Sequence, residues 1–248
     1  MLNSLRLVLD KDLDYKQSSL LQGVLFEHVD SDYVNQMHQQ NMHPYSQYIS
    51  RVGDKSVWVI NTLTDESKEK IIDPLSKEDF SSFKLKQKNG EEVHIIERSL
   101  TGIDRKTLLN DFYENKPTRK IRINFLTPTA FKHNGIYVIL PDLRLLYQSL
   151  MMKYSASSEQ LNMIDEDTLN EMVSDSFVSG YRLSSRVFPM EHTTVPGFVG
   201  NVTISFRGKS TVLQYIRLLF RFAEYSGVGI KTGMGMGAVQ IVKENDDE

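Results

Sequence analysis

The sequence contains no cysteine, and this absence removes several kinds of chemistry at once. A chain of 248 residues without cysteine forms no disulfides, has no thiol nucleophile and cannot bind zinc through thiolates. It also has no apolar run approaching the roughly 20 residues that span a bilayer. Its first residues, MLNSLRLVLD, carry charges at Arg6 and Asp10, where a signal peptide would be apolar. We therefore expect a soluble, cytoplasmic protein without a membrane partner.

A strong overall charge is missing as well, because the net charge is only −3 at pH 7. The charges are unevenly distributed, however. Residues 176–243 contain eight Lys and Arg residues, but only Glu191 and Glu224 as acids. A local excess of positive charge is typical of a surface that binds an anionic polymer, and a solvated sheet face is the alternative.

The spacing of the apolar residues predicts two successive copies of one order of elements. The first half contains strands and helices at 4–10, 18–29, 30–40, 45–52, 55–63, 64–75 and 83–100, the last of these a hairpin around Asn89–Gly90. The second half contains them at 120–131, 134–142, 142–154, 165–177, 179–188, 200–208, 210–227 and 237–242. Each half then forms a split βαβ unit. We predict an α+β fold of two tandem ferredoxin-like (RRM-like) domains, residues 1–118 and 119–248, with the polar segment 101–120 as the linker.

Glycines are concentrated near the C-terminal end of the chain. Five of the 14 occupy an eleven-residue stretch, at Gly227, Gly229, Gly233, Gly235 and Gly237. The stretch is not a Walker loop, because Ile230 precedes Lys231. It is not a Rossmann turn either, because it follows a helix and enters a strand. A helix end accounts for Gly227 and at most for Gly229.

The remaining glycines need another explanation, since each costs roughly 0.5–1 kcal/mol against alanine in regular structure. We expect the backbone amides of 229–237 to approach an anion, with Lys231 reaching a phosphate. The alternative is that the loop is a packing element between the two halves.

A glycine-rich loop at this place, after two ferredoxin-like units, resembles the CRISPR-associated repeat-processing endoribonucleases of the Cas6 family. LLQGVLFEHVDSDYVNQMHQQNMHPYS resembles the first-helix region of that family, and FLTPTAFKHNG the opening of its second half. The resemblance implies a metal-independent endoribonuclease without a cofactor. Such an enzyme cuts CRISPR precursor RNA within its repeats and leaves 5′-hydroxyl and 2′,3′-cyclic phosphate ends. It further implies repeat RNA as partner, delivery to a type III or type I effector complex, and a monomer or homodimer.

Cleavage of RNA without a metal needs a base, an acid and a group that stabilises the phosphorane. Histidine suits both proton transfers. Among the six histidines, the resemblance assigns the catalytic role to His38, with His43 as a helper or phosphate contact and Tyr45 as a weaker candidate. Some archaeal members use a Tyr-His-Lys set. This sequence departs from that set, with Phe26 at the tyrosine position and His43 or its neighbour at the lysine position.

Contacts to RNA are expected over a second region. The segment 184–201 looks too long for a tight hairpin, and long excursions are often functional. With Arg182, Arg186 and His192 it would enter the groove of an RNA stem, or it is only a connection. The acidic pieces HVDSD and DEDTLNE are more simply helix caps than metal ligands.

Two other functions fit the same composition. One is a non-catalytic RNA-binding subunit of a CRISPR effector complex, which would have no need for an accessible histidine at position 38. The other is a metabolic enzyme on a ferredoxin-like fold, which tight binding of repeat RNA would dismiss.

Overall fold

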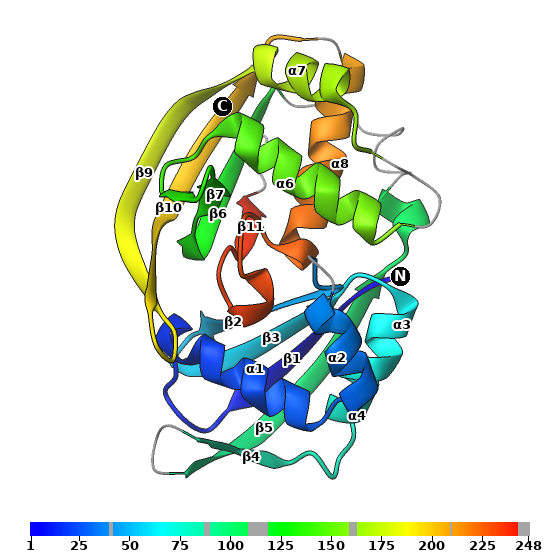
Figure 1. Cartoon of the computed structure of the whole chain (residues 1–248), viewed down its shortest axis with the longest axis vertical. Helices are drawn as coiled ribbons and strands as arrows, with labels where there is room; N and C mark the ends of the chain where they lie inside the picture. Colours follow the sequence, from blue (N-terminus) through cyan, green and yellow to red (C-terminus); the bar gives the residue numbers. More distant parts are fainter. Residues whose placement is uncertain (40–41, 87–89, 109–118, 159–162, 209, 243–248) are drawn as a thin grey trace.

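The computed structural model describes residues 1–39, 42–86, 90–108, 119–158, 163–208 and 210–242, except the side chains of His38 and Ser210. Two sheets stand one above the other, each with helices on one face, and the loop after the last helix runs between them (Figure 1). The predicted boundary at 118/119 adjoins residues 109–118, which lie outside the described residues, so the domain limits stay a prediction.

The lower half contains a five-stranded antiparallel sheet of order β2-β3-β1-β5-β4. Alternate side chains of β1, Leu5, Leu7 and Leu9, are buried against the helices, as expected for a strand with one covered face. The strands are β1 (Leu2–Leu9), β2 (Tyr45–Val52), β3 (Lys55–Thr62), β4 (Ser82–Leu85) and β5 (Glu91–Ile103). The helical segments are η1 (Tyr15–Gln17), α1 (Ser18–Glu27), α2 (Ser31–Gln39), α3 (Asp65–Ser67), the π turn η2 (Lys68–Ile72) and α4 (Asp73–Leu75).

The upper half contains a four-stranded antiparallel sheet of order β11-β6-β10-β9 and a separate two-stranded hairpin, β7-β8. The strands are β6 (Lys120–Thr129), β7 (Phe131–His133), β8 (Ile136–Val138), β9 (Ser176–Pro189), β10 (Thr194–Phe206) and β11 (Val239–Val242). The helices are α6 (Leu143–Ala156), α7 (Glu166–Ser174), α8 (Ser210–Ser226) and the 3-10 turn η3 (Thr232–Met234). In both sheets the first strand lies between the third and the last, which is the split-βαβ order. The predicted tandem fold is thus confirmed.

Local signals place the helices as expected. The Asp30 carboxylate accepts the amides of Asp32 and Tyr33 and so caps α2. At the other end of the chain, α8 stops at Gly227, whose φ of 63° is the left-handed conformation of a helix C-cap. No helix in the described part of the chain has both the length and the apolarity to cross a membrane.

The expectation that the segment 184–201 is too long for a tight hairpin is wrong. β9 and β10 pair from Ser176↔Phe206 to Pro189↔Thr194, with one register shift between Thr203 and Ile204, so the segment is one long, curved hairpin (Figure 1). The sequence misled because Pro196, Gly197 and Gly200 lie inside β10. Gly197 lies close against the backbone of Thr129, and Gly200, at φ 118°, lies close to the carbonyl of Arg182. These glycines therefore serve strand packing rather than a loop.

Candidate active site

The glycine-rich loop 227–237 is packed between the two halves of the protein. In the first half, the Gln47 amide donates to the Gly233 carbonyl over 3.2 Å, and a Cβ on Gly235 would collide with the side chain of Ser18. In the second half, a Cβ on Gly229 would collide with the Ala130 carbonyl. Gly229 and Gly235 have positive φ, as do Gly227 and Gly237. Internal packing and left-handed backbone therefore account for most of the glycines.

This packing corrects the expectation that the amides of 229–237 are offered to an anion. Six of these amides donate within the protein, those of residues 229, 230, 234, 235, 236 and 237. The Gly237 amide reaches the Pro128 carbonyl over 3.0 Å, for example, and the Ile230 amide reaches the Ala130 carbonyl over 3.0 Å. Only the stretch 231–233 remains as a source of backbone donors for a ligand.

That stretch borders a pocket of about 880 Å³ at the junction of the halves. Residues of both halves line it, from α1 and the end of β7 to α6 and the glycine loop. The charged and titratable lining residues are His43, Lys132, His133, Lys153 and Lys231. Among the described residues that line the pocket there is no Asp or Glu. In a chain of net charge −3, three lysines and two histidines without a carboxylate make a local site for an anion.

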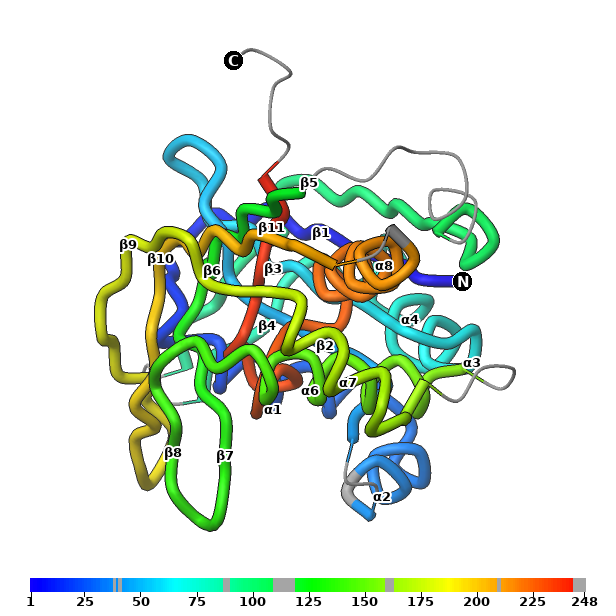
Figure 2. The backbone as a smooth tube through the Cα atoms, turned by 90° about the horizontal axis from the view of Figure 1, so that it is seen from above, coloured from blue at the N-terminus to red at the C-terminus, as the bar shows by residue number. Residues whose placement is uncertain are grey.

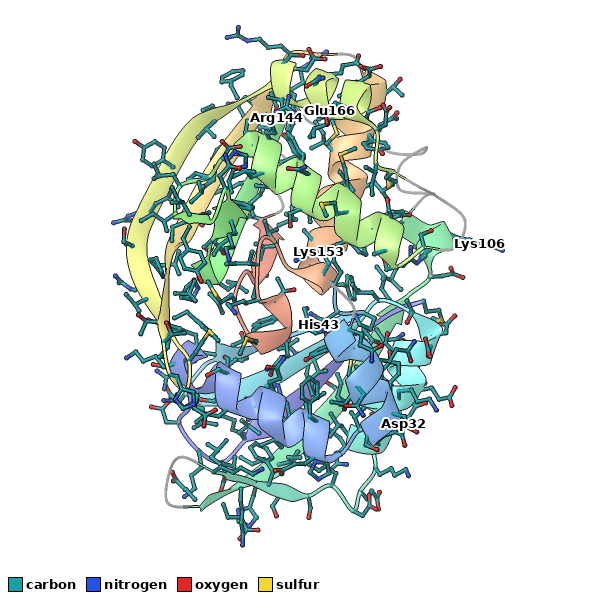
Figure 3. All side chains as sticks on the ribbon, viewed as in Figure 1. Asp32, His43, Lys106, Arg144, Lys153 and Glu166 are labelled. Atoms are coloured by element: carbon teal, nitrogen blue, oxygen red, sulfur yellow. The ribbon has the colours of Figure 1, made fainter. Side chains whose placement is uncertain are left out.

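His43 enters the pocket from the first half, just beyond α2 (Figure 3). Its ring lies beside the loop, since a Cβ on Gly233 would be 3.3 Å from His43 Cδ2. Its centroid is 5.7 Å from that of Tyr45. Gln22 of α1 also lines the pocket, and its amide donates to the Tyr45 hydroxyl over 3.0 Å. Tyr45 is thus held by Gln22 on one side and contacts the His43 ring on the other.

Tyr45 itself does not face the pocket. Its side chain is fully buried, and this burial raises the pKa of its hydroxyl above the ordinary value, with the Gln22 hydrogen bond acting in the opposite direction. A buried phenol held in its protonated form is a poor base near neutral pH. The structure thus favours a supporting role for Tyr45 over the catalytic role that the sequence suggested.

Lys153 enters from α6 on the opposite side, as Figure 3 shows. Its ammonium donates to the Ser226 and Gly227 carbonyls, over 3.3 and 3.1 Å, and to the Thr232 hydroxyl over 3.3 Å. The carbonyls belong to the C-terminal end of α8, where a cation is stabilised by the helix dipole. Burial lowers the pKa of Lys153 from 10.5 to about 7. Lys153 therefore connects α6 to the glycine loop. Its own charge changes near neutral pH.

Lys231 has an unusual backbone. Only Asn134 and Lys231 have positive φ among the non-glycine residues described, at 48° and 56°, and both line the pocket. A left-handed conformation is unfavourable for a residue with a long side chain and is retained where the surroundings impose it. Here it sets the direction of the Lys231 side chain at the wall of the pocket.

The other predicted residues are more dispersed. His38 lies in α2, one residue before its end, and its side chain is outside the described part of the chain. Arg182 and Arg186 are exposed on β9, and His192 is exposed in the turn after it, so none of them lines the pocket. The structure brings together His43, Lys231 and the loop, and leaves the β9 residues on a separate surface.

The sequence analysis missed Lys132, His133 and Lys153. A signal for Lys153 existed, since it adjoins the buried stripe of Leu146, Leu150 and Tyr154 at helical spacing. The sequence contains no such signal for Lys132 and His133, because polar residues are common beside the turn of any hairpin. In the described part of the chain, no three His, Asp or Glu residues are grouped as they would be around a metal ion.

The fold and the pocket together define a tandem ferredoxin-like protein with a pocket of basic residues at the junction of its halves. Comparisons with known proteins agree with that class. The sequence profile of the CRISPR-associated endoribonuclease Cas6 family matches residues 123–239. A CRISPR-associated endoribonuclease Cas6 of Mycobacterium tuberculosis is 39% identical over 222 residues, covering 89% of this chain and 70% of the relative. One of Streptococcus thermophilus is 36% identical over 225 residues and 90% of each chain.

This chain therefore belongs to the Cas6 family of CRISPR-associated endoribonucleases, and the resemblance drawn from its sequence is confirmed. Solved structures share the fold. A Cas6 (TTHA0078) product complex aligns with a TM-score of 0.80, at 20% identity, over 98% of this chain and 99% of the other. Thermus thermophilus Cas6 (TTHB231) aligns with a TM-score of 0.68, at 20% identity, over 98% of each chain.

Proposed function

We propose that this protein binds CRISPR repeat RNA across the junction of its two halves and cleaves it at the pocket beside His43. The observation that carries the proposal is the pocket lining, which combines two histidines and three lysines with no carboxylate among its described residues. The phosphates of RNA carry the negative charge that such a lining would bind. Membership of the family indicates the class of reaction, which is cleavage of RNA. The curated relatives are named for the same activity.

The reaction begins when a base takes the proton of the ribose 2′-hydroxyl, whose oxygen then attacks the adjacent phosphorus. An acid returns a proton to the leaving 5′-oxygen as the P–O5′ bond breaks. The products are a 2′,3′-cyclic phosphate and a 5′-hydroxyl. Imidazoles near neutral pH can perform either transfer. We assign the transfers to His38, on the strength of the resemblance, and to His43, on its place in the pocket.

Negative charge grows on the phosphorane oxygens during the attack, and the lysines are suited to stabilise it. Lys231 and Lys132 line the pocket, and in this proposal their ammonium groups contact the bound phosphate. The same lining argues for a reaction without a divalent metal. Mg²⁺ prefers carboxylate oxygens, and ammonium groups repel it.

Lys153 is a positioning residue in this proposal. An ammonium group has three donors, and all three are directed at Ser226, Gly227 and Thr232. It therefore holds the loop that carries Lys231 and Gly233 rather than contacting the phosphate directly. Phosphate contacts farther along the RNA are proposed for Arg182, Arg186 and His192, which are exposed on the β9–β10 hairpin. Such contacts set affinity and register rather than sequence.

The test is single-turnover cleavage of the cognate repeat RNA in excess EDTA. We expect undiminished cleavage with a cyclic phosphate on the upstream product. One 2′-deoxy sugar before the cut should abolish cleavage while binding persists, because the nucleophile is then absent. Loss of activity in EDTA with recovery in Mg²⁺ would refute the metal-free reaction. Binding without any cleavage would favour the non-catalytic RNA-binding subunit. A type III or type I effector complex as destination, and a cytoplasmic location, stay predictions.

A further inference from the structure

The β7–β8 hairpin is a small element with an exposed apolar end. Its turn is Asn134–Gly135, and the φ angles of 48° and 82° are those of the tight turn that suits two-residue hairpins. Ile136, directly after the turn, is 71% exposed, and among the large hydrophobic side chains described only Tyr181, at 74%, is more exposed.

The base of the hairpin is firmly held. Phe131 is buried in the core of the second half, and Tyr137 packs on the cluster around Phe188 and Met236. The Ala130 carbonyl accepts the Ile230 amide, so the hairpin is also fixed to the glycine loop. Because the base is fixed, the exposed tip is held in one place before a ligand binds. Such preorganisation favours specific binding.

The hairpin forms one wall of the pocket. Lys132, His133 and Asn134 line it, with His43 among the residues on its other walls. Figure 2 shows the hairpin extending beyond the sheets on the same side of the molecule as α2. His133 and Ile136 are directly paired across the hairpin, so their side chains lie on one face at the tip. The imidazole of His133, which lines the pocket, therefore has the exposed aliphatic side chain of Ile136 as its neighbour across the hairpin.

A nucleobase fits this tip better than a protein does. RNA-binding proteins hold unpaired bases by stacking on flat side chains such as histidine, with cations on the adjacent phosphates. Ile is among the apolar side chains that insert between bases. Lys132 adds a cation to the same hairpin, and the described pocket lining has no acid that would repel RNA. A protein partner would explain the exposed Ile136, but not the cationic pocket lined by His133, its neighbour across the hairpin.

We propose that the tip of the β7–β8 hairpin binds the nucleotide next to the scissile phosphate, with His133 and Ile136 against its base and Lys132 on its phosphate. The inference rests on the proposed function, because it takes the pocket as the place of cleavage. It adds a subsite that would make the choice of cut position depend on an unpaired base rather than on phosphate contacts alone.

The test measures binding of repeat RNA blocked by one 2′-deoxy sugar before the mapped cut, with single abasic substitutions on either side. For the wild type, we expect the loss of one base to weaken binding about tenfold, within the range for one stacked base. Ile136→Ser and His133→Ala should weaken binding of the intact RNA by a similar factor, and the abasic change should then add almost nothing. The matched control is Val52→Ser. Val52 is 56% exposed beside the two-residue turn of the β2–β3 hairpin, away from the pocket.

The proposal is supported if the abasic change weakens binding by the wild type but adds almost nothing in the Ile136→Ser or His133→Ala variant. If Ile136→Ser binds intact RNA like the wild type, or if the abasic penalty is unchanged in the variant, the tip does not hold a base. If Ile136→Ser alters only self-association, measured by sedimentation, the tip is a protein contact and the proposal is wrong. Because binding is measured without cleavage, these outcomes differ from a failure of the proposed function, in which the wild type neither cleaves nor retains the repeat.

Discussion

His43 and Lys153 come from opposite halves of the chain and line one pocket, so their roles can be separated by single substitutions. His43 is proposed to transfer a proton. The Lys153 ammonium instead donates its three hydrogen bonds to acceptors within the protein. His38 competes with His43 for the principal role. The three residues lead to two predictions at this scale.

The first prediction concerns the histidines. A general acid or base contributes about 10²–10⁴-fold. His38→Ala and His43→Ala should each slow single-turnover cleavage, at least one of them by that factor, while affinity for the repeat changes only a few fold. His94→Ala is the control, because His94 is an exposed side chain of β5 beside Asp10. If both variants cleave like the control, neither histidine transfers a proton.

The second prediction concerns Lys153 and pH. Folding lowers the pKa of Lys153 from 10.5 to about 7, so the unfolded chain binds more protons between those values. Stability rises with pH wherever the unfolded state binds more protons. The free energy of unfolding of the wild type, minus that of Lys153→Met, should therefore increase from pH 7 to 10 and stay level below pH 6. Urea titrations at each pH give this difference. A level difference across the whole window would mean that Lys153 remains charged in the folded protein.

At the scale of elements, the glycine loop shows how an unusual composition can arise from internal packing. The sequence correctly identified Gly227 as a helix end, because a left-handed C-cap depends on local backbone alone. It could not show that Gly235 lies against Ser18 of α1, because that contact joins the two ends of the chain. Ligand approach and tertiary approach require the same bare backbone, so the sequence pattern could not distinguish them.

Substitution of Gly235 tests this explanation. Gly235→Ala should lower the free energy of unfolding by about 2–3 kcal/mol, because its Cβ would collide with Ser18 and its φ of 114° is unfavourable for alanine. Thermal or urea unfolding measures the loss. Gly23→Ala is the matched control, since Gly23 lies in α1 and a Cβ added there would meet no neighbouring element within 4 Å. It should be neutral or stabilising by up to about 1 kcal/mol. A stable Gly235→Ala with weakened RNA binding would restore the ligand explanation.

The β9–β10 hairpin gives a second example at this scale. Pro and Gly at 196, 197 and 200 predict a loop by their intrinsic preferences. Pairing with β6 and β9 imposes strand structure on them instead. The hairpin reaches the first half, where the Ser19 hydroxyl donates to the Pro189 carbonyl over 3.2 Å. Its exposed Arg182 and Arg186 are thus carried on a rigid ribbon rather than on a mobile arm.

For the whole molecule, the halves are joined by more than their linker. The Ser46 hydroxyl donates to the Tyr225 carbonyl over 2.5 Å, and the Asn61 amide donates to the Glu224 carbonyl over 3.4 Å. With the Gln47–Gly233 bond, these place the end of α8 and the loop on strands β2 and β3. We therefore expect calorimetry to show one unfolding transition, with equal calorimetric and van't Hoff enthalpies.

Gln47→Ala should lower the midpoint of that transition. It would remove the bond to the loop and leave the indole N–H of the buried Trp58 without its Gln47 acceptor. Two well-separated transitions in the wild type would show that the halves fold independently and that the pocket between them can open without unfolding either one.

The sequence by itself determined the order of the strands and helices, the two ferredoxin-like units and the family, because these follow from local periodicity and short motifs. It also indicated His43, whose neighbours along the chain form a recognisable segment. Only the tertiary structure decided that Lys132, His133, Lys153 and Lys231 meet His43 in a pocket whose described lining has no acid. That grouping depends on how two separately patterned halves dock, and docking is determined by side-chain shape across an interface rather than by any period along the chain.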